Sequence, residues 1–452
     1  MLFLAFVFVY ASNAFCTATP PDSTTSIVDK TSAAIIIEDG RTLFSKGKIK
    51  NALIKFRQAS VKDPHSWKAF YWVSKCHYRM NNYGYALKYA KLAMKQGGEK
   101  VNDEVYFMLG CTYHRLGSLD TAMINYKRAL EALPKRRSNE LLVEHHIKEC
   151  DFAKVELTKN DDNKFGKERV RGDVNSGYDD YNIVLVDNNT IYFTSRRSNT
   201  MGGGMNPDDQ RFYEDIYKAT FDPETQEWDN VTNELGKLNS EGFDALNYIS
   251  KDGLTAILTL NTTTTDRKKT TRGSDIAEAK YSNKGTWNTP KAIKNKSINT
   301  SFFEGSASLT ADGNTMYFVS DRKGEKSSTD IYVVRKNGKN WGEAKALPMT
   351  VNTKGRETTP YITPDGRFLF YSSDGMLGMG GLDVYVVEYK GGSWGTPINL
   401  GSGINTVNND SHFVYSEAMK KAFLAGYEII GNKSSIDLYE LNFTDFVIPT
   451  NK

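Results

Sequence analysis

Five carboxylates recur at one position of a sequence repeat in the second half of the chain. Each lies five residues after an asparagine, and the five are Asp180, Asp244, Glu304, Glu357 and Asp410. Carboxylates that repeat around a ring of strands would face its central channel, where they could bind a cation, a glycan or a basic peptide. The structural alternative is that they accept hydrogen bonds from N–H groups of neighbouring strands. The sequence leaves both interpretations open.

Residues for catalysis do not come together in this sequence. The G-x-S-x-G motif of serine hydrolases is absent, and His412 is the only histidine after His146. That leaves little for Ser-His-Asp chemistry and no cluster of nitrogen ligands for zinc. The glycine-rich segments 201–205 and 378–381 are not phosphate cradles, because neither is followed by a helix or a P-loop lysine. Their methionines could contact a partner or simply fill turns. We expect a non-catalytic protein without a cofactor or bound metal.

A second group of candidate residues lies in the first half of the chain, on the first helices of predicted helical pairs. They are Lys68, Tyr71, Lys75, Arg79, Asn102 and Arg115. First helices of stacked pairs line a concave groove. The sequence therefore predicts either a groove that binds a peptide or protein, or a solvated face that only spaces the second half of the chain from its anchor.

The helical pairs are visible as alanines seven residues apart. The pairs are Ala52 and Ala59, Ala86 and Ala93, and Ala122 and Ala129, with separations of 34 and 36 residues between pairs. This spacing is close to the tetratricopeptide period. In the third unit Gly110 allows close helix packing, whereas the second unit has Lys75 where we expect that glycine. A last helix, 140–157, would cap the stack. We predict a repeat domain over 33–158, after a tether over 17–32 and before a linker over 159–167.

The second half repeats a different unit. The aspartates that open Asp-Ile-Tyr-like triplets are Asp215, Asp275, Asp330, Asp383 and Asp437, at separations of 60, 55, 53 and 54 residues. Tryptophans follow in four of the units, at 228, 287, 341 and 394. Periods of this length, divided into several short strands, indicate propeller blades. We predict a multidomain α plus all-β chain that ends in a five-bladed β-propeller over 168–445, or six blades if 442–449 forms strands.

The ring also has a predicted closure. The segment RVRGDVNS at 169–176 resembles NLGSGINT at 399–406, which is the outer strand and exit turn of a blade. An outer strand therefore precedes the first blade, and the last blade lacks one. Joining the two would leave no unpaired sheet edge.

The N-terminus resembles a secretory signal peptide over 1–16, with an apolar run that ends in Ser12-x-Ala14. A membrane anchor is the alternative, but the run is too short to span a bilayer. Cys16 is a candidate for lipidation, although Phe15 replaces the usual small residue before it. The other cysteines, at 76, 111 and 150, fit buried positions better than a disulfide framework. With 58 basic and 54 acidic residues, the charge balance gives no argument for nucleic acid.

Taken together, the repeats resemble those of Bacteroidota envelope proteins of the PorE type, which place a tetratricopeptide stack before a WD40-like, TolB-type propeller. The blade ends Trp394, Pro397 and 404–406 (Ile-Asn-Thr) carry the resemblance, which covers about 33–445. It implies a periplasmic or outer-membrane-associated scaffold, with Cys16 as the candidate lipid attachment, that binds envelope proteins of type IX secretion or gliding. Family members continue into an OmpA-like domain, but this sequence stops at Lys452 without one. We therefore expect only indirect contact with peptidoglycan.

Overall fold

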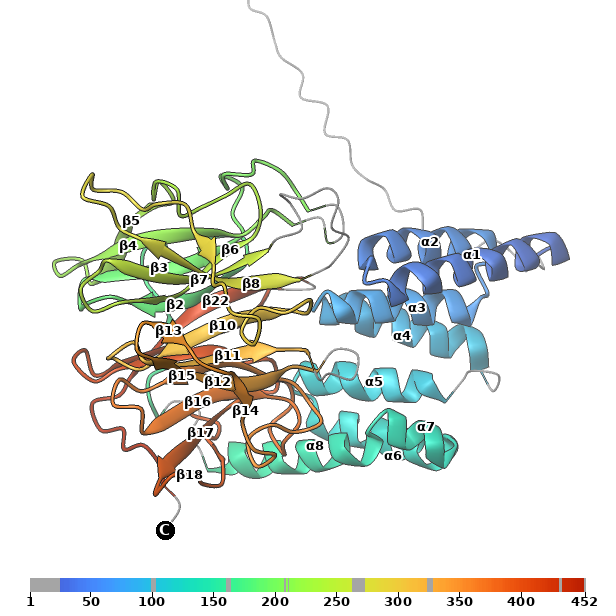
Figure 1. The fold of residues 1–452 in the computed structure, drawn as a ribbon. Helices are drawn as coiled ribbons and strands as arrows, with labels where there is room; N and C mark the ends of the chain where they lie inside the picture. Colours follow the sequence, from blue (N-terminus) through green and yellow to red (C-terminus); the bar gives the residue numbers. More distant parts are fainter. Residues whose placement is uncertain are drawn as a thin grey trace, which may run out of the picture.

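A stack of helices lies beside a ring of β-sheets in this computed structural model (Figure 1). The structure describes residues 25–98, 103–159, 164–206, 209, 211–261, 273–322, 328–430 and 433–450. The predicted signal peptide and Cys16 lie outside these residues. The fold class predicted from the repeats is confirmed: tetratricopeptide-like helical repeats precede a five-bladed propeller.

The helical stack contains three antiparallel pairs and two further helices. The pairs are α1 (Ile27–Ser45) with α2 (Ile49–Lys62), α3 (Trp67–Arg79) with α4 (Tyr83–Gly97), and α5 (Glu104–Arg115) with α6 (Leu119–Ala132). A short helix α7 (Lys135–Glu140) leads to α8 (Val143–Thr158), which packs on α6. The helix α1 begins before the predicted start at residue 33, because the Ser26 side chain accepts a hydrogen bond from the Asp29 N–H and caps it.

One small residue in each pair lets the two helices approach closely. A Cβ atom on Gly40 would lie 2.6 Å from the Phe56 ring, and one on Gly110 would lie 2.5 Å from the Tyr126 ring. The equivalent residue in the second pair is Ser74, which is fully buried and donates from Oγ to the Ala86 carbonyl at 2.7 Å. Assigning Lys75 to this position was therefore wrong by one residue. Gly40, Ser74 and Gly110 each lie 12 residues before the first alanine of their unit (Ala52, Ala86 and Ala122), so the register is the same in all three pairs.

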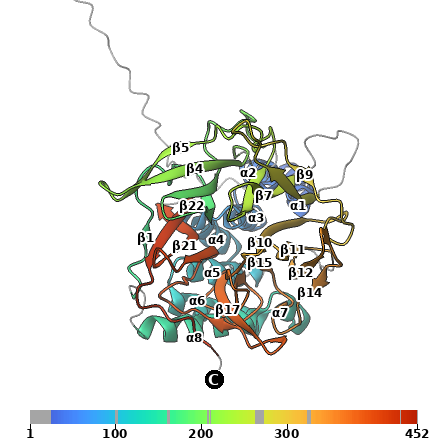
Figure 2. The ribbon, with the colours of Figure 1, turned by 60° about the vertical axis from the view of Figure 1, so that its left-hand side comes forward.

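Five antiparallel sheets form the ring (Figure 2). Blade one contains β2 (Asp180–Leu185), β3 (Thr190–Ser195), β4 (Asp215–Asp222) and β5 (Glu227–Thr232). Blade two contains β6 (Asp244–Ile249), β7 (Thr255–Asn261), β8 (Ser274–Lys280) and β9 (Lys291–Ala292). Blade three contains β10 (Glu304–Leu309), β11 (Thr315–Ser320), β12 (Asp330–Asn337), β13 (Asn340–Trp341) and β14 (Lys345–Ala346).

Blade four contains β15 (Glu357–Ile362), β16 (Phe368–Ser373), β17 (Asp383–Lys390), β18 (Ser393–Trp394) and β19 (Ile398–Asn399). Blade five contains β20 (Ser411–Ser416), β21 (Lys421–Ile430), β22 (Lys433–Asn442) and β1 (Glu168–Arg169). In the described residues the chain makes no strand after β22, so the six-bladed alternative is wrong.

The first strand closes the ring as predicted. Glu168 pairs with Glu440 and Arg169 with Tyr439, so β1 supplies the outer strand of blade five. Just before β1, the Lys167 ammonium donates to the Asp410 carboxylate at 2.9 Å. The predicted complementarity of the two half-blades is therefore confirmed.

An asparagine joins each blade to the one before it. Its side-chain carbonyl accepts the N–H of a third-strand residue and its amide donates to the carbonyl of that same residue, at 2.7 to 3.0 Å. The pairs are Asn239 with Ile216, Asn299 with Ile276, Asn352 with Ile331, Asn405 with Val384 and, across the closure, Asn175 with Leu438. The amide thus acts as one more residue of the neighbouring sheet ladder.

We expect Asn175→Ala to lower the free energy of unfolding by about 2 kcal/mol, because it leaves both backbone groups of Leu438 without this partner. Denaturant unfolding followed by tryptophan fluorescence would measure the change, since Trp228 is buried in the same hydrophobic cluster as Leu438. Asn337→Ala, at an exposed position, is the matched control. Equal unfolding midpoints for the two variants would contradict this role of Asn175.

Candidate functional site

The predicted groove of the helical stack is lined by aromatic rings with a lysine above them. The Lys75 ammonium lies 4.7 Å from the ring centre of Trp72, 5.4 Å from that of Tyr71 and 5.8 Å from that of Phe44. The Arg41 guanidinium lies 5.5 Å from the Trp72 ring. Burial lowers the pKa of Lys75, while the nearby Glu104 carboxylate acts in the opposite direction. The rings therefore hold a partly dehydrated cation inside the groove.

The carboxylate of Glu104 lies close to these rings, and a cation balances its charge. The Tyr71 hydroxyl donates to Glu104 at 2.6 Å, and Arg137 Nε donates to the other carboxylate oxygen at 2.8 Å. Burial works against ionisation of Glu104, but these two hydrogen bonds bring its pKa below the ordinary value. Glu104 therefore stays ionised, and the Arg137 guanidinium balances its charge in the ion pair.

The structure places five of the six predicted groove residues, in three groups. Tyr71 and Lys75 lie together in the groove, as described. Lys68 and Arg79 are exposed on the same helix, with the Lys68 ammonium 5.8 Å from the Trp67 ring. Asn102 lies outside the described residues. Arg115 faces the propeller and not the open groove, because its Nη1 donates to the Val407 carbonyl at 2.7 Å.

Helix ends of the stack meet the turns of one propeller face (Figure 1). His114 donates from Nε2 to the Met379 carbonyl at 2.8 Å, next to the Arg115 contact. At another point Asn81 donates to the Tyr427 hydroxyl at 2.7 Å and accepts from Ser434 Oγ at 2.7 Å. The stack is therefore attached to the propeller through several hydrogen bonds.

The glycine-rich loop of blade four is part of this contact. Met379 is fully buried in the same hydrophobic cluster as Tyr71, Cys111 and Tyr126 of the stack. A Cβ atom on Gly381 would lie 2.3 Å from the Asn408 carbonyl oxygen and 2.4 Å from Arg115 Nη1. The loop thus binds the stack of its own chain, with glycines where the backbones approach most closely. From the sequence we considered that the methionine of this loop contacts an external partner or fills a turn. Its contact with the helical stack was missed.

The acidic ring is buried and used in hydrogen bonding. Each carboxylate accepts from the backbone N–H and the hydroxyl of a Ser or Thr four residues earlier. These pairs are Asp180 with Ser176, Asp244 with Ser240, Glu304 with Thr300, Glu357 with Thr353 and Asp410 with Thr406. Three of them also pair with cations: Asp180 with Arg197, Glu304 with Arg322 and Asp410 with Lys167. The N–H groups come from the turn before each inner strand and not from neighbouring strands.

Neutral polar residues occupy the channel instead. A cavity of about 40 Å³ is lined by inner-strand residues of all five blades, among them Asn182, Asn247, Ser306, Thr359 and His412. Burial lowers the pKa of His412 to about 4. Such a volume has room for only a few water molecules. In the described ranges no group of three or more His, Cys, Asp or Glu side chains is arranged to hold a metal ion. No helix in those ranges is both long and apolar enough to cross a membrane.

No protein-family model matches the chain, and no curated protein does. Several solved structures are similar in fold. One is the Yersinia enterocolitica type III secretion chaperone SycD with a peptide of the translocator YopD, at 17% identity, 28% coverage of this chain, 99% of the other and a TM-score of 0.26. Another is the first TPR of Spaghetti (RPAP3) bound to an HSP90 peptide, at 23% identity, 25% and 92% coverage and a TM-score of 0.23. A third is the α-L-arabinofuranosidase PaAbf62A from Podospora anserina, at 11% identity, 61% and 94% coverage and a TM-score of 0.38.

We expect Gly381→Ala to loosen the helical stack from the propeller, because the added Cβ has no space against Asn408 and Arg115. Limited proteolysis should cut the linker, predicted over 159–167, faster than in the wild type. Gly177→Ala is the matched control, since a Cβ there meets no atom within 4 Å. The same cleavage rate for both variants would show that this contact does not hold the two domains together.

A pH dependence follows from His114. Burial, and then the Arg115 guanidinium, lower its pKa from 6.5 to about 4 in the folded protein. Between these values the unfolded chain binds a proton that the folded chain does not, so His114 lowers stability as the pH falls. His114→Gln, which can still donate to Met379, should therefore reduce the loss of unfolding free energy between pH 7 and pH 5 by about 2 kcal/mol. Urea unfolding at the two pH values would test this, with the exposed His65→Gln as control. An unchanged loss in His114→Gln would contradict the assignment.

Proposed function

We propose that this protein is a non-catalytic scaffold whose helical groove binds an acidic segment of a partner protein. The observation that carries the proposal is the Lys75 ammonium above three aromatic rings. Arg41, Lys68 and Arg79 add positive charge nearby, and the charge of Glu104 is balanced by its ion pair with Arg137. A carboxylate that enters the groove would gain a charge-assisted hydrogen bond with a cation already positioned by its surroundings.

The propeller supports this role as a rigid body. Its backbone carbonyls at Met379 and Val407 accept hydrogen bonds from His114 and Arg115, which are the last two residues of α5. The orientation of the stack is thereby fixed before a partner arrives, which reduces the entropy lost on binding. We propose that the partner spans the open part of the groove, between Arg41 and Glu104.

For the cellular setting we propose the envelope of a Bacteroidota-type bacterium, in the periplasm or at the outer membrane. The support is the apolar run before Ser12-x-Ala14 and the resemblance of the repeats to PorE-type proteins. We propose partners from a secretion or gliding assembly of the type IX kind, with Cys16 as the candidate point of lipid attachment.

The alternative function, a channel sensor for a cation, glycan or basic peptide, has weaker support. The five carboxylates are fully buried and already accept two hydrogen bonds each from their own turns. The cavity beside His412 measures about 40 Å³, which is too small for a sugar ring or a peptide side chain of any length.

A photo-crosslinking residue placed at position 68, in the groove, tests the main proposal. We expect adducts with a defined envelope protein from this position, and none from the same residue at position 127, which is exposed on the second helix of the third pair. Lys75→Ala should reduce the adduct about tenfold, because the positioned cation is lost. Lys127→Ala should leave it unchanged.

The proposal fails if both positions give the same adducts, or if Lys75→Ala has no effect on an adduct from position 68. Thermal unfolding of each variant shows whether the helical stack remains folded.

A further inference from the structure

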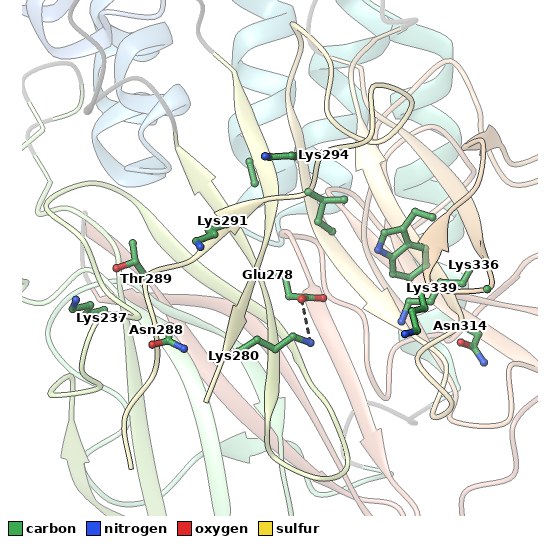
Figure 3. Close-up of a pocket in the computed structure, with 14 residues that line it drawn as sticks. Lys237, Glu278, Lys280, Asn288, Thr289, Lys291, Lys294, Asn314, Lys336 and Lys339 are labelled. Carbon is green, nitrogen blue, oxygen red and sulfur yellow. Dashed lines mark ion pairs between the residues drawn. The ribbon is translucent and has the colours of Figure 1, made fainter. Parts of the chain in front are cut away.

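A long open groove runs along the rim of the propeller between blades two and three (Figure 3). Its volume is about 1020 Å³, and a second hollow of about 420 Å³ continues it past Lys280 and Lys336. The groove shares no lining residue with the helical stack or with the channel. It is therefore a separate surface from the site proposed above.

Positive charge is concentrated in this groove. Six lysines line it, from strands β8, β9 and β12 and from three connecting segments: Lys237, Lys280, Lys291, Lys294, Lys336 and Lys339. All six are exposed, and the only acidic residue that lines this larger hollow is Glu278, which forms an ion pair with Lys280 at 3.1 Å. The smaller hollow is lined in addition by Asp252 and Asp312. Figure 3 shows the pair of Glu278 and Lys280 between the lysines of the two blades. Since the whole chain is nearly balanced in charge, this surface (the lysine groove) is a local feature.

One wall of the lysine groove is the edge of a sheet. The Ile293 N–H donates to the Ile276 carbonyl at 2.9 Å, and Ala292 lies opposite Ala277. Because hydrogen bonds alternate along an antiparallel strand, the N–H and C=O of Ala292 point away from β8. They have no partner among the described residues, and Ala292 is exposed between two lysines. Such an edge can pair with one more extended strand.

The aromatic residue of the groove is not free to stack on a sugar. The Lys336 ammonium lies 4.9 Å from the Trp341 ring centre, and the Asn295 amide donates to the Trp341 carbonyl at 2.8 Å. With a cation already over the ring, the indole holds Lys336 in the groove and offers less surface to a carbohydrate.

We infer that the lysine groove binds an extended, acidic peptide segment of a partner protein. The segment pairs with the edge of β9 at Ala292, and its carboxylates lie among the lysines of blades two and three. Alternation of side chains in a strand places every second residue toward the lysines, so alternating acidic residues fit best. Electrostatic attraction supplies most of the rate of association and strand pairing fixes the register.

The test uses the full chain and a fluorescein-labelled peptide of about ten residues in which Glu alternates with Thr. Fluorescence anisotropy at low salt should show binding that the double variant Lys291→Glu/Lys294→Glu weakens about tenfold or more. The control Lys390→Glu/Lys420→Glu makes the same charge change at exposed lysines outside the groove, and should alter the affinity less than about twofold.

Ala292→Pro tests the strand pairing separately. It removes an N–H that makes no bond within the sheet, and proline is tolerated at such an edge position. This variant should weaken binding of the acidic peptide severalfold while leaving binding of polygalacturonate, an anionic glycan, unchanged.

The inference is overturned if the peptide binds equally to the wild type and to Lys291→Glu/Lys294→Glu. It is also overturned if polygalacturonate binds through these lysines and the peptide does not. If Lys75→Ala abolishes peptide binding while the lysine-groove variants do not, the peptide occupies the helical groove. That result supports the proposed function and refutes the inference about the lysine groove.

Discussion

The propeller depends on one repeated interaction, the double hydrogen bond between an asparagine side chain and the backbone of the preceding blade. At every junction the next residue is a Ser or Thr, whose N–H and hydroxyl are bound by the buried carboxylate of the following inner strand. Asparagine thus connects neighbouring sheets, while the carboxylate holds the turn on its own sheet. The recurrence of acidic residues around the ring has a structural explanation, because a buried carboxylate must be hydrogen bonded and each of these is.

The same junctions determine where the helices attach. The turn after Asn405 carries Thr406, bound to Asp410, and the neighbouring Val407 carbonyl accepts the Arg115 guanidinium. A turn that is already fixed by its carboxylate gives the stack a rigid contact. Arg115 of the stack therefore contacts the propeller, whereas Lys75 lies over its aromatic rings.

Most of the fold could be predicted from the sequence because both halves are repeats. The aspartates and tryptophans recur at nearly regular intervals, which can be read directly from the sequence. The similarity of 169–176 to 399–406 was sufficient to predict the closure by β1. Prediction was less accurate at the small residue that each helical pair needs. Ser74 was missed in favour of Lys75, and Gly40 was missed in the first pair, although both lie 12 residues before the first alanine of their unit, as Gly110 does.

Contacts between the two domains could not be predicted in this way. Met379 lies in a glycine-rich loop without periodicity, and nothing in the loop itself indicates that it is buried against helices far away in the chain. The positions of the five buried carboxylates could be found from their spacing. The groups that donate hydrogen bonds to these carboxylates could be identified only from the structure. The lysine groove was also missed, because its six lysines come from three strands and three connecting segments and are separated widely in the sequence.

The place of β1 has a consequence for how the molecule is made. Arg169 must pair with Tyr439, so the ring cannot be completed until nearly the whole chain has been synthesised. Contacts in the helical stack are local, and such contacts form earlier and faster than distant strand pairings. We expect a nascent chain with finished helices and an open arc of blades, whose free sheet edges need protection from aggregation until the last blade emerges.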